Sequence, residues 1–246
     1  MSDKPRIPFH FHANCHALSG EFHRPVPHSL GTFAATSLPS IGGHAHAHVE
    51  RHDVPRLVSF RNAHGHVSGS WQDEDTITTE ATASIECLSI LHVLTADRIV
   101  ARLTAEAKRK QSEPYILALG STFQNLRIGG HEVKVTLRHD LFLESKTFPE
   151  LQKRVAKDAK SAKMSVAGDG VLLCSLVDEI VTDLPGAKVV GHILEVPHFG
   201  KIAFAEVFAA DSTRTLTMLR LQLGSPDSGN LTVVEALTNG KPMPPP

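Results

Sequence analysis

The sequence predicts an all-β fold, an antiparallel β-sandwich or barrel of long strands with one inserted α-helix at about residues 147–163. Apolar and polar residues alternate with a period of two along most of the 246 residues, which is the pattern of half-buried strands. Clusters of Gly, Pro, Asn and Asp separate these stretches, as turns do. Helical segments do not recur between the strands, as a parallel α/β fold would require, so antiparallel pairing is favoured.

The strands follow one another at short intervals from the start of the chain. A Gly129-Gly130 turn joins two of them as a hairpin, and the segment 227–230 forms a longer hairpin turn. We expect strands at residues 7–22, 43–52, 57–71, 78–92, 97–109, 115–127, 131–137, 171–181, 188–196, 200–208, 214–223 and 230–238.

One segment departs from the period of two. Thr147 is suited to cap a helix, and Glu150 stands three positions later, as in a capping box. Leu151, Val155 and Ala159 then recur at helical spacing. We therefore expect a single β-rich domain over residues 1–240, with a helical insertion at about 138–186 and a flexible Pro-rich tail at 241–246.

The composition limits the classes of function. The hydrophobic fraction of 41% permits a large core, and the formal net charge of −1 argues against broad electrostatic binding to nucleic acid. No stretch approaches the ~18 consecutive apolar residues of a membrane-spanning helix, so we expect no membrane insertion. Cys15, Cys87 and Cys174 are far apart, and neither a disulfide framework nor a CxxC zinc pattern is visible.

Histidine is the anomaly of the composition, because eleven of the 16 histidines lie at or before His66. In the strand 43–52 every even position from 44 to 52 is His or Glu, and the odd positions are mostly Ala and Val. The strand 7–22 carries His10, His12 and His16 at even positions, and the strand 57–71 carries His64 and His66. Since alternate residues of a strand share a face, each strand presents its histidines on one side.

This spacing predicts a metal site. Same-face neighbours on a strand lie ~6.5–7 Å apart, and two imidazoles can converge over that gap on one ion. Imidazole-rich sites suit Zn, Cu, Ni or Fe(II), so the expected cofactor is a divalent transition metal. The ligand candidates, in order of preference, are His44, His46, His48, His64 and His66, followed by His10 and His12.

The chemistry expected of such a site is metal-assisted hydrolysis or oxidation of a small-molecule or polymer substrate. Glu50 is the nearest candidate base, and Glu86 is a second carboxylate that could serve as base or ligand. Glu80 is a further candidate, and Arg98 and Arg102 could hold an anionic substrate if their strands neighbour the histidine strands. The alternatives are a solvated polar face, a pH-responsive face, or a non-catalytic surface, adhesion or metal-storage module.

Several short sequence segments resemble segments of bacterial choice-of-anchor proteins. They are the runs at 83–91, 94–101, 120–130 and 196–202 and the closing pair of strands. The resemblance is scattered over most of residues 10–238 and is absent from about 138–186. It implies a β-rich module that is usually exported and often tethered at the cell surface, and it implies no reaction and no catalytic residues.

This sequence departs from that pattern in two ways. It places histidine where such proteins carry mainly Ser, Thr and Ala. It also starts without a signal peptide, so it is expected to be either cytoplasmic or a mature exported protein. A homo-oligomer is also compatible with the sequence. The other histidines are expected to be ordinary loop or surface residues: His23, His28, His92, His131, His139, His192 and His198.

Overall fold

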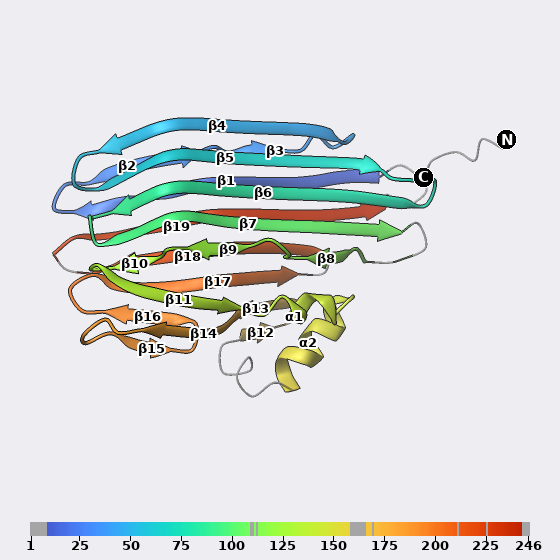
Figure 1. The fold of residues 1–246 in the computed structure, drawn as a ribbon. Coiled ribbons are helices and arrows are strands. Elements are labelled where there is room, and N and C mark those ends of the chain that lie inside the picture. The colour runs from blue at the N-terminus through green and yellow to red at the C-terminus, as the bar shows by residue number, and fades with distance from the viewer. Residues whose placement is uncertain are drawn as a thin grey trace.

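The computed structural model describes residues 9–108, 111, 113–157, 166–168, 170–210, 212–224 and 226–242. Within these residues two antiparallel sheets pack face to face (Figure 1). Each sheet has a strand at either end of its path, so the sandwich is confirmed and the barrel is not.

The ten-stranded sheet, called sheet I, contains both terminal strands. Its main path runs β12-β13-β17-β18-β19-β1-β2, with β3 paired to β1, β16 to β17 and β15 to β16. The bounds of its strands are β1 (Phe9–Arg24), β2 (His28–Phe33), β3 (Thr36–Ser37), β12 (Val166–Gly168), β13 (Val171–Ser175), β15 (Lys188–Val190), β16 (Ile193–Val196), β17 (Gly200–Ala210), β18 (Thr213–Leu223) and β19 (Ser228–Pro242).

The nine-stranded sheet, called sheet II, runs β14-β11-β10-β7-β6-β5-β4, with β8 and β9 both paired to β7. Its strands β4 to β7 are successive hairpins, so neighbours in the chain are neighbours in space. Their bounds are β4 (Gly43–Val54), β5 (Val58–Trp71), β6 (Thr76–Ile90), β7 (Leu94–Lys108), β8 (Tyr115–Leu117), β9 (Thr122–Gln124), β10 (Arg127–Ile128), β11 (His131–Leu137) and β14 (Val177–Thr182).

The core fills the space between the sheets. The rings of Phe123 in sheet II and Phe204 in sheet I meet edge to face, with centroids 5.8 Å apart. The Cys15 thiol of β1 reaches across the core and donates to the carbonyl of Thr82, 3.2 Å away on β6. Cys15 is a small buried residue, as its position opposite the histidines predicts. Its burial raises the pKa of the thiol to about 11.

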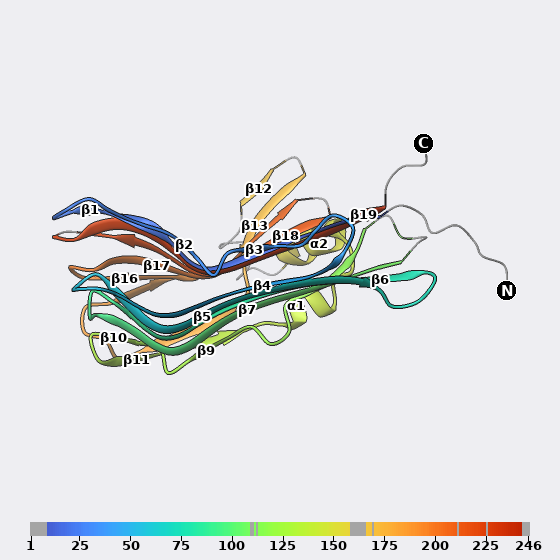
Figure 2. The ribbon, with the colours of Figure 1, turned by 90° about the horizontal axis from the view of Figure 1, so that it is seen from above.

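Both layers bend at mid-length (Figure 2). At the bend the alternation of inward and outward side chains reverses. On β5 both Phe60 and Ala63 are buried, and on β6 both Ile85 and Leu88 are buried. Strands on each sheet carry a non-glycine residue of positive φ in this region: Arg51 (35°) and Cys87 (52°) in sheet II, and Ala205 (46°) and Val234 (56°) in sheet I.

The prediction of one continuous strand over residues 115–127 is wrong, because the structure has three short strands there, β8, β9 and β10. The break between β8 and β9 has a side-chain cause. The Ser121 hydroxyl accepts a hydrogen bond from the Arg102 amide at 2.9 Å and lies 3.2 Å from the Arg102 carbonyl, so it occupies both backbone groups of that β7 residue.

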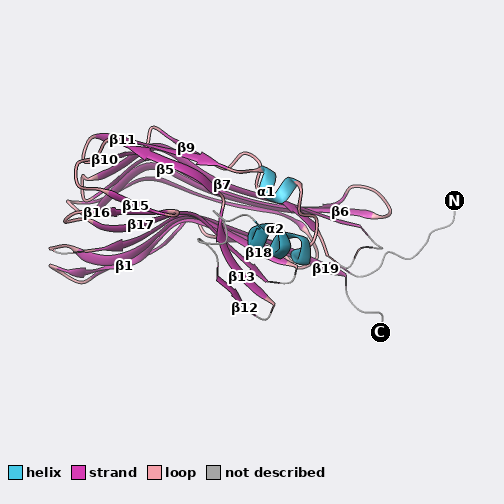
Figure 3. Ribbon diagram, turned by 90° about the horizontal axis from the view of Figure 1, so that it is seen from below, coloured by secondary structure: helices cyan, strands magenta, loops and turns pink. Residues whose placement is uncertain are grey.

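In the described part of the chain two short helices lie beside each other among the strands (Figure 3). They are α1 (Asp140–Leu143), which the sequence did not predict, and α2 (Phe148–Lys157). Thr147 caps α2 as predicted, since its hydroxyl lies 3.4 Å from the Glu150 amide while the Glu150 carboxylate accepts from the Thr147 amide at 3.3 Å. Residues 158–163 of the predicted helix lie outside the described residues.

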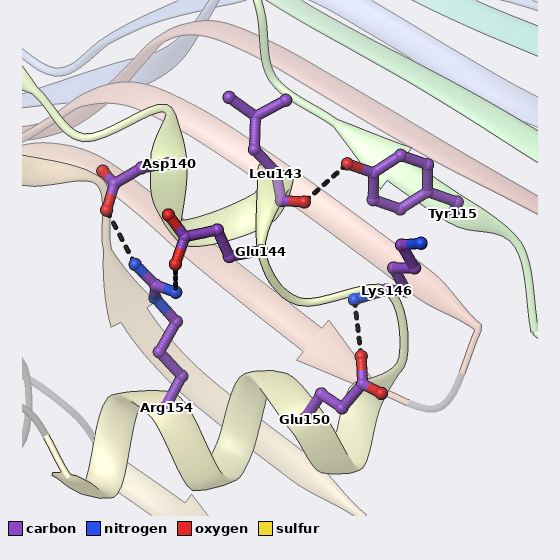
Figure 4. Close-up of polar contacts among 7 residues, drawn as sticks. All are labelled: Tyr115, Asp140, Leu143, Glu144, Lys146, Glu150 and Arg154. Atoms are coloured by element: carbon purple, nitrogen blue, oxygen red, sulfur yellow. Dashed lines mark hydrogen bonds and ion pairs between the residues drawn. The ribbon is translucent and has the colours of Figure 1, made fainter.

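Polar contacts hold the helices to each other and to sheet II (Figure 4). Arg154 of α2 bonds to Asp140 at 2.8 Å and also to Glu144, and the Tyr115 hydroxyl of β8 donates to the Leu143 carbonyl at 2.8 Å. The predicted insertion at about 138–186 is not purely helical, because it also supplies β12 and β13 to sheet I and β14 to sheet II.

The predicted tail at 241–246 also needs adjustment, since β19 extends to Pro242 and residues 243–246 lie outside the described residues. No helix in the described part of the chain is both long enough and apolar enough to cross a membrane.

Candidate functional site

Four predicted ligands meet on the outer face of sheet II because β4 and β5 form one antiparallel hairpin. In its register His46 lies directly opposite His66, and His48 lies directly opposite His64. All four side chains are exposed. Opposed residues of such a pair have Cα atoms ~4.5–5.5 Å apart, and the two pairs lie ~6.5–7 Å apart along the strands. We call these four residues the histidine quartet.

One pair of the quartet is already in contact. The rings of His48 and His64 stack with centroids 4.1 Å apart and planes 6° from parallel. The pKa of His64 lies below its ordinary value. Partial burial is the largest cause, the neighbouring imidazole of His48 and the charge of Arg98 add to it, and Glu86 opposes the shift. His64 is therefore biased toward the neutral form, which is the form that can bind a metal ion.

A polar row borders the quartet toward the bend. Glu50, Asn62, Glu86 and Arg98 lie side by side on β4 to β7. Asn62 donates to Glu86 at 3.0 Å, and the Arg98 guanidinium lies 3.7 Å from the same carboxylate. Glu86 is thus held by two neighbours, whereas Glu50 is exposed at the edge strand.

A second ion pair borders the quartet on β6 and β7. Arg102 bonds to Glu80 at 2.9 Å, and the Thr82 hydroxyl donates to the same carboxylate at 3.1 Å. The condition set for these residues, that their strands neighbour the histidine strands, is met, since β6 pairs with β5 and β7 with β6. The arginines are paired with carboxylates of their own sheet.

The remaining predicted ligands are distributed differently. His44 lies on the same face but opposite Ser68, so it extends the β4 row without a histidine partner. His10 and His12 are exposed on β1, which belongs to sheet I. Their neighbours Phe9, Phe11 and Ala13 point into the core, so His10 and His12 face away from the quartet across the whole sandwich. They cannot join it in one site within one chain.

The prediction that His52 shares the face of His44 to Glu50 is wrong. Its ring packs against Phe33 of β2 and Phe60 of β5, with centroids 4.3 and 5.4 Å away, so it points between the sheets. The positive φ of Arg51 reverses the alternation immediately before it.

The quartet is not assembled as a coordination sphere. No group of three or more His, Cys, Asp or Glu side chains within the described ranges is placed to hold a metal ion. Tetrahedral coordination at ~2.0–2.1 Å requires ligand nitrogens about 3.4 Å apart whose in-plane lone pairs converge on the ion, so the parallel rings of His48 and His64 have to turn out of their stack to bind. Exposed imidazoles on neighbouring strands can make that movement by side-chain rotation.

A family model described as Domain of unknown function (DUF8256) matches residues 9–165 and 150–210. The chain belongs to the DUF8256 family. No curated protein and no solved structure matches it. The match covers all strands that carry the quartet, and the resemblance to choice-of-anchor proteins stays a prediction.

Sequence reasoning missed a charged cluster around a buried carboxylate in this DUF8256 domain. His192, expected to be an ordinary loop residue, is only 8% exposed, and its Nε2 lies 3.2 Å from Glu206, which is equally buried. The Arg220 guanidinium lies 2.7 Å from the other oxygen of Glu206. These contacts lower the pKa of Glu206 despite its burial. The residues come from separate strands and a turn, so no local spacing indicates them.

An open hollow of about 560 Å³ lies beside α2 of the DUF8256 domain. None of the predicted site residues lines it. Its lining side chains are Arg138, Glu144, Glu150, Lys153, Arg154 and Lys157.

Proposed function

We propose that this protein is a metal-binding β-sandwich module and that the histidine quartet takes up a divalent transition-metal ion. The observation that carries the proposal is the β4–β5 register, which places His46 opposite His66 and His48 opposite His64 on one exposed face. Four imidazoles with no cysteine among them suit Zn, Cu(II) or Ni, and Fe(II) if a carboxylate such as Glu50 joins them.

The position of the quartet favours binding over catalysis. Its side chains are exposed on an open sheet face, whereas reaction centres usually lie in concave pockets that exclude water. The carboxylate of Glu86 is held by Asn62 and Arg98, which leaves Glu50 as the nearer candidate base. The non-catalytic alternative is therefore preferred to a metal-dependent hydrolase or oxidoreductase, and the choice-of-anchor resemblance supports the same preference.

The test is a titration of the tag-free protein with ZnCl₂, with CuCl₂ and with NiCl₂, in which binding is measured by isothermal titration calorimetry at neutral pH. We expect saturable binding by the wild type and strong loss of affinity in the double variant H48A/H64A. The matched control is H10A/H12A, which removes two exposed histidines from a strand of sheet I and should bind as the wild type does.

Two results would contradict the proposal. One is an occupancy below ~0.2 ion per chain after mild dialysis, far from the nearly complete occupancy of a dedicated site. The other is an equal loss of affinity in both double variants, which would indicate scattered binding by any exposed histidine.

A further inference from the structure

The strand β4 is an open edge next to the quartet. The path of sheet II ends at β4, and no strand in the described part of the chain pairs with its outer side. Natural edge strands are usually protected by Lys, Pro, a bulge or a short length. Residues 44–50 contain neither Lys nor Pro and form a regular run, which lies between the positive φ of Gly43 and that of Arg51.

The inner side of this edge is apolar and incompletely covered. Ala45, Ala47 and Val49 point toward the core, yet each of them is only partly buried. A further strand placed beside β4 would cover this row and satisfy the outward backbone groups, as strand addition does in other sheets.

The run from His44 to Glu50 is complementary to itself. In an antiparallel pair of two copies centred on Ala47, His44 faces Glu50 of the second copy, Ala45 faces Val49, and His46 faces His48. A potential cation then stands opposite a carboxylate at both ends of the run, and apolar residues face each other on the inner side.

We propose that two copies of this chain pair antiparallel through β4 and that the pairing joins their histidine quartets. Such a pair is a closed two-fold contact between identical surfaces. The two sheets II become continuous, and the outer face carries two rows of four imidazoles across four strands. In each row His66 and His46 of one copy are followed by His48 and His64 of the other. The role of the joined rows in metal binding rests on the proposed function.

A cysteine placed on the two-fold axis tests the pairing directly. The test variant is A47C/C87S, in which C87S removes the exposed Cys87 thiol. In the proposed pair, the cysteine at position 47 of one copy faces the same cysteine of the other copy. Directly opposed residues have Cα atoms ~4.5–5.5 Å apart, within the ~4.4–6.8 Å range that a disulfide spans. In the matched control A45C/C87S, the two new cysteines are four residues out of register, ~13 Å apart along the strands.

We expect A47C/C87S to form at least ten times more covalent dimer than A45C/C87S on mild oxidation, and wild-type sedimentation to give twice the mass of one chain. Circular dichroism spectra identical to wild type establish that both variants fold. A monomeric wild type together with equal cross-linking in both variants would overturn the pairing and leave an extended peptide of another protein as the occupant of the edge.

Calorimetry with ZnCl₂ on the same proteins separates this proposal from the proposed function. Zinc binding without specific cross-linking overturns the pairing alone. Specific cross-linking, together with no binding of zinc, copper or nickel in the titrations described above, supports the pairing and overturns the metal function.

Discussion

Replacing Gly65 by alanine perturbs the strand between His64 and His66 without touching either imidazole. A Cβ added at Gly65 would lie 2.2 Å from the Ala34 carbonyl oxygen. Ordinary contacts of a Cβ begin at 3.4 Å, so more than 1 Å of space has to open. The obstacle is backbone, which cannot rotate away as a side chain can.

The expected cost follows from this geometry. Overpacking a filled core costs about 1–3 kcal/mol, and a backbone obstacle places G65A at the upper end, near 3 kcal/mol. For a domain of this size each kcal/mol lowers Tm by roughly 2–4 °C, so we expect a fall of about 6–12 °C. In G69A the nearest atoms belong to the side chains of Phe11 and Leu38, so that variant should lose less.

The assay is guanidinium unfolding followed by circular dichroism, with the midpoint and the slope fitted separately. The matched control is G168A, because a Cβ there meets no atom within 4 Å. Its stability should stay within about 0.5 kcal/mol of wild type. Equal stabilities of G65A and G168A would refute the close approach of β5 to the segment that precedes β3.

The remaining predictions concern ionisable groups. Native protein should react with a thiol reagent at Cys87 alone and denatured protein at three thiols, because burial raises the pKa of Cys15 to about 11 and of Cys174 to about 12; fast modification of three native thiols would contradict the fold. Because His64 has a lowered pKa, the unfolded chain binds its proton first as the pH falls below about 6.5, so wild type should lose stability from there down to the folded pKa; a pH profile of unfolding in which H64Q loses as much would be inconsistent with this. E206Q should unfold about 1.5–3 kcal/mol more easily in guanidinium, since it removes the charge of a buried carboxylate that His192 and Arg220 contact, and an unchanged midpoint would count against those contacts.

The alternation of residue types predicted most long strands because burial acts locally on a period of two. It also predicted which face of β4 and β5 carries the quartet. The capping of α2 was predictable because it is also local in sequence: Thr147 and Glu150 interact within one turn.

The bend could not be predicted in this way. Positive φ at Arg51 and Cys87 carries no sequence signal, because Gly and Asn are the residues expected there. The reversal that follows turns His52 from the outer face toward the space between the sheets. The assignment of His10 and His12 to the other sheet is equally nonlocal, since it depends on the pairing of β1 with β19, at opposite ends of the chain.

The turn between β4 and β5 is a sequence signal from which the pairing inside the quartet could have been predicted. β4 and β5 are joined by a short turn in which the Leu57 amide donates to the Val54 carbonyl at 3.0 Å. Two alternating strands joined by a turn containing Pro55 indicate a hairpin. Counting outward from that turn leads to His48 opposite His64 and His46 opposite His66.

The most direct test of metal binding by the quartet is an anomalous difference map from zinc-soaked crystals of the tag-free protein. The quartet predicts one strong peak above β4 and β5, ~2.0–2.1 Å from imidazole nitrogens of at least three of its four residues. A well-occupied peak elsewhere with none over the quartet, or no peak at saturating zinc, would contradict the proposed function.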